Sequence, residues 1–404
     1  MCATRSAEST IKGFLYQFHK TAAEIISADE ADVLTVEGII EDIDIQSADD
    51  ATIAIQCKYH ESASSYTPSI IYKPLLQMAV HDSNNHGTKC RYRIFIHIPN
   101  QAQQVRQITD AELAGARQST DSKLTKIIEK IGAGFDVDSF RSRTEIEFGP
   151  SLLSLESELK TKLAELAIPN ADVDTILYPN AINFVSRLAT GSTPSDRETS
   201  RTRFKHFLAS THETAISRWT LALRDRKKVL DAKRAQLRQH LSQNTRKRYL
   251  YFEPKQLHDF EDGIIIFIKN FLAKYHCKVA HTKTPLIAID GDTRDIEIHQ
   301  RRLFKKDIRA HTGLIGGVFE VGELFRPPMR KTIGSRLIQR EFDLRLLACA
   351  EHRAVLNEKK CDDIYFVTEE IPSDIDIMDV NATVLGVSTF SELEYVLSMR
   401  DSYE

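Results

Sequence analysis

Two short runs of alternating residues decide how the first part of this chain folds: Glu41-Asp42-Ile43-Asp44-Ile45-Gln46 and Ile53-Ala54-Ile55-Gln56-Cys57-Lys58. Successive side chains of a β-strand point to opposite faces, so the isoleucines of each run are expected to face a core. Asp42 and Asp44 then share the outer face of one strand, and Gln56 and Lys58 share that of the next. The polar turn between the runs is short enough to make the two strands neighbours.

The flanking segments predict a small α/β core around these strands. A helix is expected at 9–27, a strand-like run at 34–46 before the second strand at 52–58, a helix after Pro68, and a strand at 92–98. This order describes a mixed sheet flanked by helices. Helical patterns at 110–131 and 152–167 and a strand at 144–148 extend it.

The polar face of the two strands carries groups suited to phosphodiester chemistry. Carboxylate and amide oxygens hold Mg²⁺, and an ammonium group can stabilise charge beside an attacking water. Asp42, Asp44, Gln56 and Lys58 would supply both on one surface. Taken singly, such pairs are often only a solvated strand face, so the prediction depends on finding them on consecutive strands.

These residues resemble the PD-(D/E)XK nuclease superfamily, which pairs an acidic residue on one strand with (E/Q)-x-K on the next. Within roughly residues 9–100, the chain is similar to the double-stranded DNA endonuclease effector domain of bacterial anti-phage systems of the CBASS and Lamassu types. The resemblance is carried by Gly13-Phe14-Leu15-Tyr16-Gln17, Val36-Glu37-Gly38, Glu41-Asp42-Ile43-Asp44 and Ile55-Gln56-Cys57-Lys58.

The resemblance implies a restriction-endonuclease-like first domain that uses Mg²⁺, with Mn²⁺ as a substitute. By the motif, Asp44 matches the metal-binding acid, with Asp42 as its rival because the register is open. Gln56 matches the second metal-side residue, and Lys58 matches the catalytic lysine. Glu24, on the first helix, matches an additional metal ligand. Gln56 replaces the usual acid, so it can offer the metal only a neutral oxygen.

A loop at 190–196 suggests two domains, 1–195 and 196–404. In the second we expect a long charged helix at 203–244 and an α-rich α+β fold. Its other expected elements are helices at 260–275 and 391–399 and strands at 286–289, 295–298 and 364–367.

The expected long helix carries a local basic patch in a chain whose net charge is only −3. Its candidate DNA-binding residues are Arg224, Lys227, Lys228, Arg234 and Arg238. A DNA-binding surface needs cations that neutralise the phosphates, although a helix face exposed to solvent explains the same pattern of charged residues.

Other sequence features narrow the class of protein. The six cysteines are scattered without zinc-ligand spacing, and no apolar run is long enough to span a membrane. The first residues lack the apolar core expected of a signal peptide, and the glycines do not have the spacing of a phosphate-binding loop. A cytoplasmic protein with reduced thiols is expected, and any ATP-driven step would require a partner.

Residues and resemblance together predict a Mg²⁺-dependent DNA endonuclease effector of an anti-phage defence complex, held inactive until assembly or a partner's signal. The expected partners are double-stranded DNA, subunits of an SMC-like ATPase complex and, in the active state, further copies of the chain. Three alternatives stay open: a nuclease-fold scaffold or DNA-binding subunit without activity, a CBASS-type endonuclease activated by a cyclic oligonucleotide, and a restriction endonuclease with a target-recognition domain.

Overall fold

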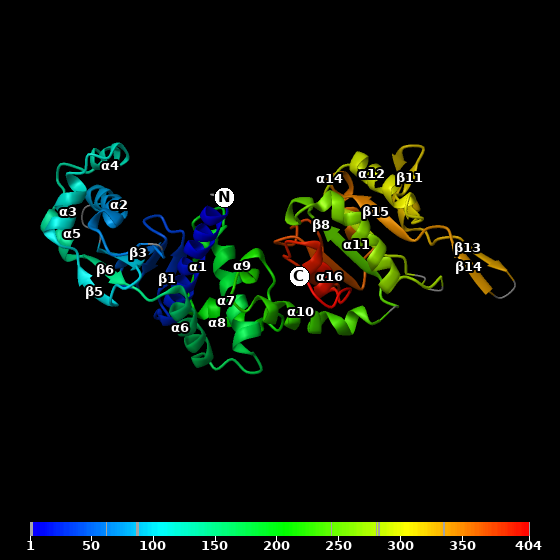
Figure 1. Cartoon of the computed structure of the whole chain (residues 1–404), viewed down its shortest axis with the longest axis horizontal. Helices are drawn as coiled ribbons and strands as arrows, with labels where there is room; N and C mark the ends of the chain where they lie inside the picture. Colours follow the sequence, from blue (N-terminus) through cyan, green and yellow to red (C-terminus); the bar gives the residue numbers. More distant parts are fainter. Residues whose placement is uncertain are drawn as a thin grey trace. The chain divides into compact units, whose positions relative to one another are not determined.

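The computed structural model describes residues 3–61, 63–85, 89–243, 245–279, 281, 283–333 and 336–403. The chain divides into two compact units, residues 1–212 and 213–404 (Figure 1). This division falls later than the boundary expected at residue 195. The reason is local: β7 (Glu198–Thr199) pairs with β1 (Val33–Val36), and Phe204 of the following helix packs against Phe184.

The first unit is a mixed α/β domain. Its helices are α1 (Ala3–Ser27), α2 (Tyr72–Asn84), α3 (Asp110–Arg117), α4 (Ser122–Ile128), α5 (Val137–Ser142), α6 (Leu152–Glu165), α7 (Tyr178–Ala189) and α8 (Arg201–Ser210). Its remaining strands are β2 (Ile43–Gln46), β3 (Thr52–Tyr59), β4 (Cys90–His97), β5 (Gln104–Gln107) and β6 (Thr144–Phe148). Short turns of helix occupy 68–71, 173–177 and 195–197.

Seven strands of this unit form one sheet in the order β5-β6-β4-β3-β2-β1-β7. β1, β2 and β3 are antiparallel neighbours, whereas β3, β4 and β6 run parallel. The expected mixed sheet flanked by helices is therefore confirmed. The run predicted at 34–46 is two strands, β1 and β2, joined by a turn at 37–42.

Helices cover both faces of this sheet. Tyr16 of α1 is fully buried and stacks on Phe95 of β4, with ring centroids 5.0 Å apart. The apolar residues of α2 pack in a cluster that includes Ala54 of β3. Because side chains alternate along a strand, Gln56 and Lys58 share the face of Ala54, which is the α2 face.

The second unit contains the remaining elements. Its helices are α9 (Arg218–Leu221), α10 (Arg226–Leu241), α11 (Phe260–Tyr275), α12 (Thr293–Phe304), α13 (Val321–Phe325), α14 (Cys349–His352), α15 (Val355–Glu358) and α16 (Phe390–Val396), with a short turn of helix at 254–256. Its strands are β8 (Arg248–Phe252), β9 (Leu286–Ile289), β10 (Ala310–His311), β11 (Leu314–Ile315), β12 (Val318–Phe319), β13 (Arg330–Ile333), β14 (Arg336–Arg340), β15 (Leu344–Ala348), β16 (Asp363–Val367) and β17 (Asn381–Val384).

Six of these strands form a sheet in the order β10-β15-β9-β8-β16-β17, in which every neighbouring pair is parallel. Parallel sheets are covered by helices on both faces. Leu250 and Phe252 accordingly enter a cluster with α10, α11 and α16, while Tyr249 and Tyr251 enter a second cluster with α13 to α15. The second unit is thus an α/β domain, and the expected α-rich α+β fold is wrong.

Two further expectations for this unit are corrected. The long helix expected at 203–244 is broken into α8, α9 and α10, with capping side chains at Ser200 and Ser217 that start new helices. The strand expected at 295–298 lies inside α12, whose capping box joins Asp292 and Asp295. By contrast, the helix expected at 260–275 has the same bounds as α11.

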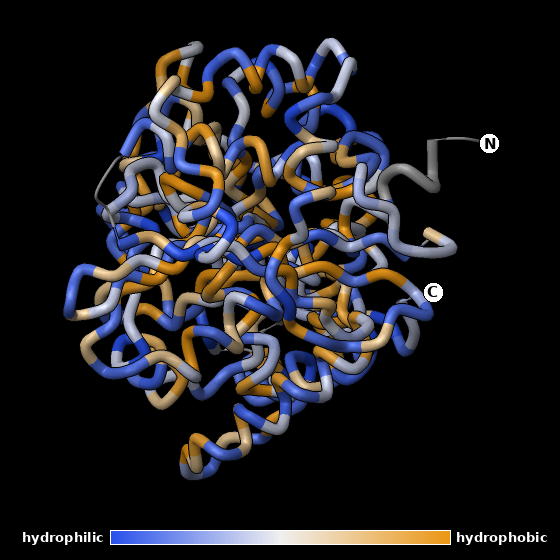
Figure 2. The backbone as a smooth tube through the Cα atoms, turned by 90° about the vertical axis from the view of Figure 1, so that its left-hand side faces the viewer, coloured by the Kyte–Doolittle hydropathy of each residue, from blue (hydrophilic) through white to orange (hydrophobic). Residues whose placement is uncertain are grey.

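The distribution of hydropathy agrees with two buried sheets. In Figure 2, many hydrophobic stretches of the backbone lie in the middle of the view, and many of the outer loops are hydrophilic. Among the described residues, none of the helices is both long enough and apolar enough to cross a membrane.

Candidate active site

The turn at 37–42 brings an acidic residue to the strand that carries Gln56 and Lys58. The antiparallel register of β2 and β3 places Ile43 opposite Ile55, so Asp42, immediately before β2, comes opposite Gln56. The turn is fixed from two sides. Gln17 of α1 donates to the Glu37 carboxylate at 2.8 Å, and Arg197 donates to the Glu37 carbonyl at 2.5 Å.

Asp42 is held firmly through one of its two oxygens. Its Oδ2 accepts hydrogen bonds from the backbone N–H of Cys57 at 2.7 Å and from the Gln56 amide. The described residues give Oδ1 no hydrogen bond. A carboxylate anchored through one oxygen leaves the other available to a cation, and such anchoring is common for metal ligands.

Lys58 supplies the positive charge of this site. The structure gives its ammonium group no ion pair with any described residue. It nevertheless acts electrostatically on Asp42 and Glu41: burial raises the pKa of both carboxyl groups, and Lys58 opposes this rise. Lys58 is therefore a cation that the fold leaves available beside two acids.

Glu41 is a member of this cluster that the sequence motif did not single out. Its Oε1 is buried without a hydrogen-bond partner in the described structure. Burial raises the pKa of Glu41 to about 8, and the neighbouring Asp42 adds to the rise. Its position directly before Asp42 was the available signal. The alternation rule concealed it, because it assigns Glu41 to the opposite face from Asp42 if the strand extends that far.

The register keeps Asp44 on the same face of the sheet as Gln56, but its carboxylate is buried and both of its oxygens are occupied. Its Oδ2 accepts from the Ile40 backbone at 2.9 Å, and its Oδ1 accepts from the Glu41 backbone at 3.1 Å. A side chain at Gly38 would collide with this carboxylate. Asp44 thus satisfies the backbone of the turn, and the geometry favours Asp42 over Asp44 as the acid facing Gln56.

Glu24 lies on the other side of the sheet. It pairs with Lys20 at 2.8 Å, and Lys20 also reaches Glu147 at 3.1 Å while its ammonium sits 4.1 Å from the centre of the Phe95 ring. Phe95 faces α1, whereas Gln56 faces α2. The structure therefore does not bring Glu24 to Asp42, and Glu24 instead lines a separate pocket with Glu147.

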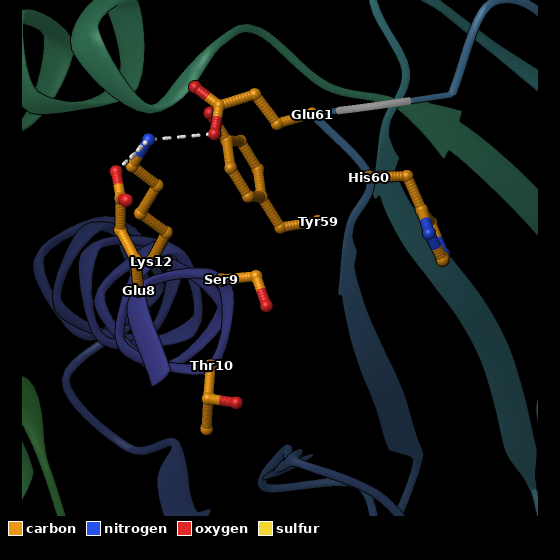
Figure 3. A pocket seen from close by; sticks show the side chains of 7 residues that line it. All are labelled: Glu8, Ser9, Thr10, Lys12, Tyr59, His60 and Glu61. Atoms are coloured by element: carbon orange, nitrogen blue, oxygen red, sulfur yellow. Dashed lines mark hydrogen bonds and ion pairs between the residues drawn. The ribbon is translucent and has the colours of Figure 1, made fainter. Parts of the chain in front are cut away.

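An open pocket of about 570 Å³ lies where β3 ends, beside the first turns of α1 (Figure 3). Lys12 bridges Glu8 at 3.1 Å and Glu61 at 2.7 Å on one side of it. His60 comes from the strand end and points away from this bridge in Figure 3. Its Nε2 is buried without a partner in the described structure. Lys58 does not line this pocket, and the lining, with two glutamates and one lysine, has no excess of positive charge.

The candidate DNA-binding residues belong to the second unit, on and just before α10. Arg224, Lys227, Lys228 and Arg238 are exposed, and Lys228 pairs with Asp225 at 3.8 Å. Arg234 is partly engaged, 3.3 Å from Asp401 and stacked over the Tyr395 ring.

Other cations of the same stretch have structural partners. Arg246 pairs with Asp363 at 2.6 Å, and Arg248 donates to three carbonyl groups at the end of α10. The free basic surface is smaller than the sequence suggested.

The donor set fits Mg²⁺ held jointly by protein and substrate. Among the described residues, no three His, Cys, Asp or Glu side chains are grouped as a metal cage. Mg²⁺ commonly takes only one or two carboxylates and completes its shell with water and phosphate oxygens. The Oε1 of Glu41 and the Oδ1 of Asp42, neither hydrogen-bonded to a described residue, are the two carboxylate oxygens that could bind the ion.

Comparison of the chain with protein-family models finds no matching family, and comparison with curated protein sequences finds no significant match.

Proposed function

We propose that the first unit is a metal-dependent endodeoxyribonuclease with a restriction-endonuclease-like fold, acting in an anti-phage defence complex. The observation that carries the chemistry is that Asp42 is clamped to the strand of Gln56 and Lys58 with one oxygen left free. The resemblance of the motif stretches supports the biological setting. The pairing of β2 with β3, which carry the motif residues, supports the restriction-endonuclease-like fold.

Each residue of the site has a distinct role in this proposal. Asp42 binds the metal through Oδ1, with Glu41 as a second carboxylate, and Gln56 and the Cys57 backbone orient Asp42. Bound there, Mg²⁺ supplies the charge that polarises a phosphodiester and lowers the pKa of water. Lys58 stabilises the negative charge that develops as water oxygen bonds to phosphorus and the bond to the sugar oxygen breaks.

Supercoiled plasmid incubated with the full-length protein and Mg²⁺ or Mn²⁺ tests the proposal. Wild type should nick or linearise the plasmid, and Lys58→Ala should not. Lys73→Ala is the matched control because Lys73 is an exposed lysine of the same unit, on α2. Since the isolated chain is expected to be weakly active, protein concentration is varied widely. Binding of duplex without cleavage at any concentration would favour the inactive scaffold instead.

A second candidate is control of the nuclease by a small ligand, as in the cyclic-oligonucleotide alternative. The order of the parallel strands reverses between β8 and β16, and open parallel sheets bind ligands beyond the carboxyl ends of their strands at such a point. A rise in melting temperature on adding a cyclic oligonucleotide, together with activation of cleavage, would support it. Activation by an SMC-like ATPase complex without any ligand would support the assembly alternative.

A further inference from the structure

β13 and β14 form an arm that is separate from the main sheet of the second unit. They pair only with each other, as an antiparallel two-stranded sheet. Figure 1 shows this pair extending outward from the six-stranded sheet of the same unit. We call strands β13 and β14 the basic arm. An isolated two-stranded ribbon buries little apolar surface, so the arm adds little to the core of the unit.

All charged residues in the sequence of the arm and its base are positive. Residues 326–340 contain five cations and neither Asp nor Glu: Arg326, Arg330, Lys331, Arg336 and Arg340. The chain as a whole has a net charge of −3, so this is a local concentration of positive charge. Such a concentration on one element is the electrostatic feature expected of a nucleic-acid contact.

Two of these arginines attach the arm to the domain. Arg326 makes a bidentate ion pair with Glu341, at 2.7 Å for each bond, and a further pair with Glu323 at 2.6 Å. Arg340 is buried and donates to the carbonyls of His276 and Lys278. These contacts fix the base of the arm, so their charges are not available to a partner.

Arg330 and Lys331 are the remaining cations whose side chains the structure describes. Both are exposed, and the structure gives neither an ion pair with any described residue. Arg330 also lies directly opposite Arg340 in the strand register. The charge of Arg340 is balanced by Asp343, 3.4 Å away, so the unbalanced charge of the arm's described side chains is that of Arg330 and Lys331. Two exposed cations without a counter-charge among the described residues favour an anionic partner over an uncharged one.

We infer that the basic arm binds the sugar-phosphate backbone of duplex DNA, an inference that rests on the proposed nuclease function. The major groove of B-DNA admits a two-stranded β-ribbon, and several DNA-binding proteins place such a ribbon there. The register shift between Lys331 and Thr332 marks a bulge, which increases the twist of a ribbon. Arg330 and Lys331 contact phosphates, so the binding is independent of base sequence.

The test measures binding of the full-length protein to a labelled duplex of random sequence without Mg²⁺ or Mn²⁺, so that no strand is cut. Fluorescence anisotropy is recorded over a series of NaCl concentrations. The arm variant is Arg330→Gln with Lys331→Gln. The control variant is Lys305→Gln with Lys306→Gln, which removes the same charge from an adjacent exposed pair in the same unit. Thermal melting verifies that both variants are folded.

The arm variant should bind about tenfold more weakly, and its slope of log Kd against log salt should fall by about 2, or roughly 1 for each phosphate that the variant no longer neutralises. The control should change Kd less than twofold. Unchanged Kd and slope in the arm variant would overturn the inference. So would arm-dependent binding confined to duplex RNA, measured in parallel, or absence of duplex binding by wild type.

Cleavage assays separate this inference from the proposed function. If wild type binds duplex through the arm but never cuts it in Mg²⁺ or Mn²⁺, the nuclease proposal fails and the arm stands. If wild type and arm variant bind and cut equally, the arm fails and the nuclease proposal stands.

Discussion

The carboxylate of Asp42 accepts a hydrogen bond from the backbone N–H of Cys57 at 2.7 Å, which ties the acid to the strand that carries Gln56 and Lys58. A backbone donor holds this acid whatever side chain occupies position 57. Positional accuracy of this kind is required of a group that binds a metal or a reacting phosphate. Strands β2 and β3 are therefore joined by this hydrogen bond of Asp42 as well as by the backbone hydrogen bonds of their antiparallel pairing.

Asp42→Ala should abolish cleavage, whereas Asp44→Ala should mainly reduce stability. Loss of Asp42 removes the free oxygen assigned to the metal. Loss of a residue that only supports a metal ligand lowers activity by about 10- to 100-fold, so the decrease in kcat for Asp42→Ala should be larger than this. Loss of Asp44 leaves the Ile40 and Glu41 amides without an acceptor, at a cost of about 1–3 kcal/mol.

Steady-state cleavage rates and urea unfolding of both variants decide between these roles. This prediction reverses the preference for Asp44 that the motif suggested. A stable Asp44→Ala protein without activity, beside an active Asp42→Ala protein, would restore the original assignment.

Cleavage should require Mg²⁺ or Mn²⁺ and should fail in Ca²⁺. Carboxylate oxygens bind all three ions, but Ca²⁺ adopts a larger and looser shell that does not align water with the phosphate. DNA binding measured in Ca²⁺ should persist, which separates loss of chemistry from loss of substrate. Full activity in EDTA would exclude the proposed use of a metal.

Strand alternation indicated a common face for Asp42, Gln56 and Lys58 but did not decide which of the two acids is open. Gln56 and Lys58 lie within the regular strand β3, so the period of two fixed their common face, and the register puts Asp44 opposite Ala54 on that same face. Asp42 lies in the turn before β2, where Glu37 adopts a left-handed φ of 48°. Whether Asp42 or Asp44 satisfies the backbone of this turn depends on its conformation, and the turn is held by distant contacts with Gln17 and Arg197.

The second unit was harder to predict for a different physical reason. Strands β8, β9, β15 and β16 are buried on both faces, so their sequences are mostly apolar and show no regular alternation. Arg248 begins β8, and a charged residue there gives no indication of a buried strand. Its guanidinium binds carbonyls at the end of α10, a capping role that sequence does not distinguish from a surface charge.

Cleavage of duplex DNA should rise more steeply than linearly with protein concentration. One site of this kind cuts one strand, so a double-strand break by a single site needs two events, whereas two copies can cut both strands together. Rates measured across a concentration series, with light scattering at the same concentrations, test this expectation. A monomer that linearises plasmid with strictly first-order dependence would contradict it.

The stability of the first unit should fall as the pH decreases from 6.5 to about 4, through His19. This side chain is fully buried, with Nδ1 2.6 Å from the Leu15 carbonyl and Nε2 2.8 Å from the Tyr178 hydroxyl. A carbonyl can only accept, so Nδ1 carries the proton and the bare Nε2 accepts from Tyr178. Protonation of Nε2 would place a charge in the core and would require the Tyr178 hydroxyl to accept where it now donates. Burial accordingly lowers the pKa of His19 to about 4.

The sign of the effect follows from proton uptake. Below pH 6.5 the unfolded chain protonates at His19 and the folded chain does not, so the free energy of unfolding decreases by about 1.4 kcal/mol per pH unit, to a total of about 3 kcal/mol near pH 4. Urea unfolding at pH 7.5 and 4.5 should show this loss in wild type and a smaller one in His19→Gln. His206→Gln, at an exposed histidine of the same unit, should behave as wild type. Equal acid sensitivity of His19→Gln and wild type would assign the loss to other groups.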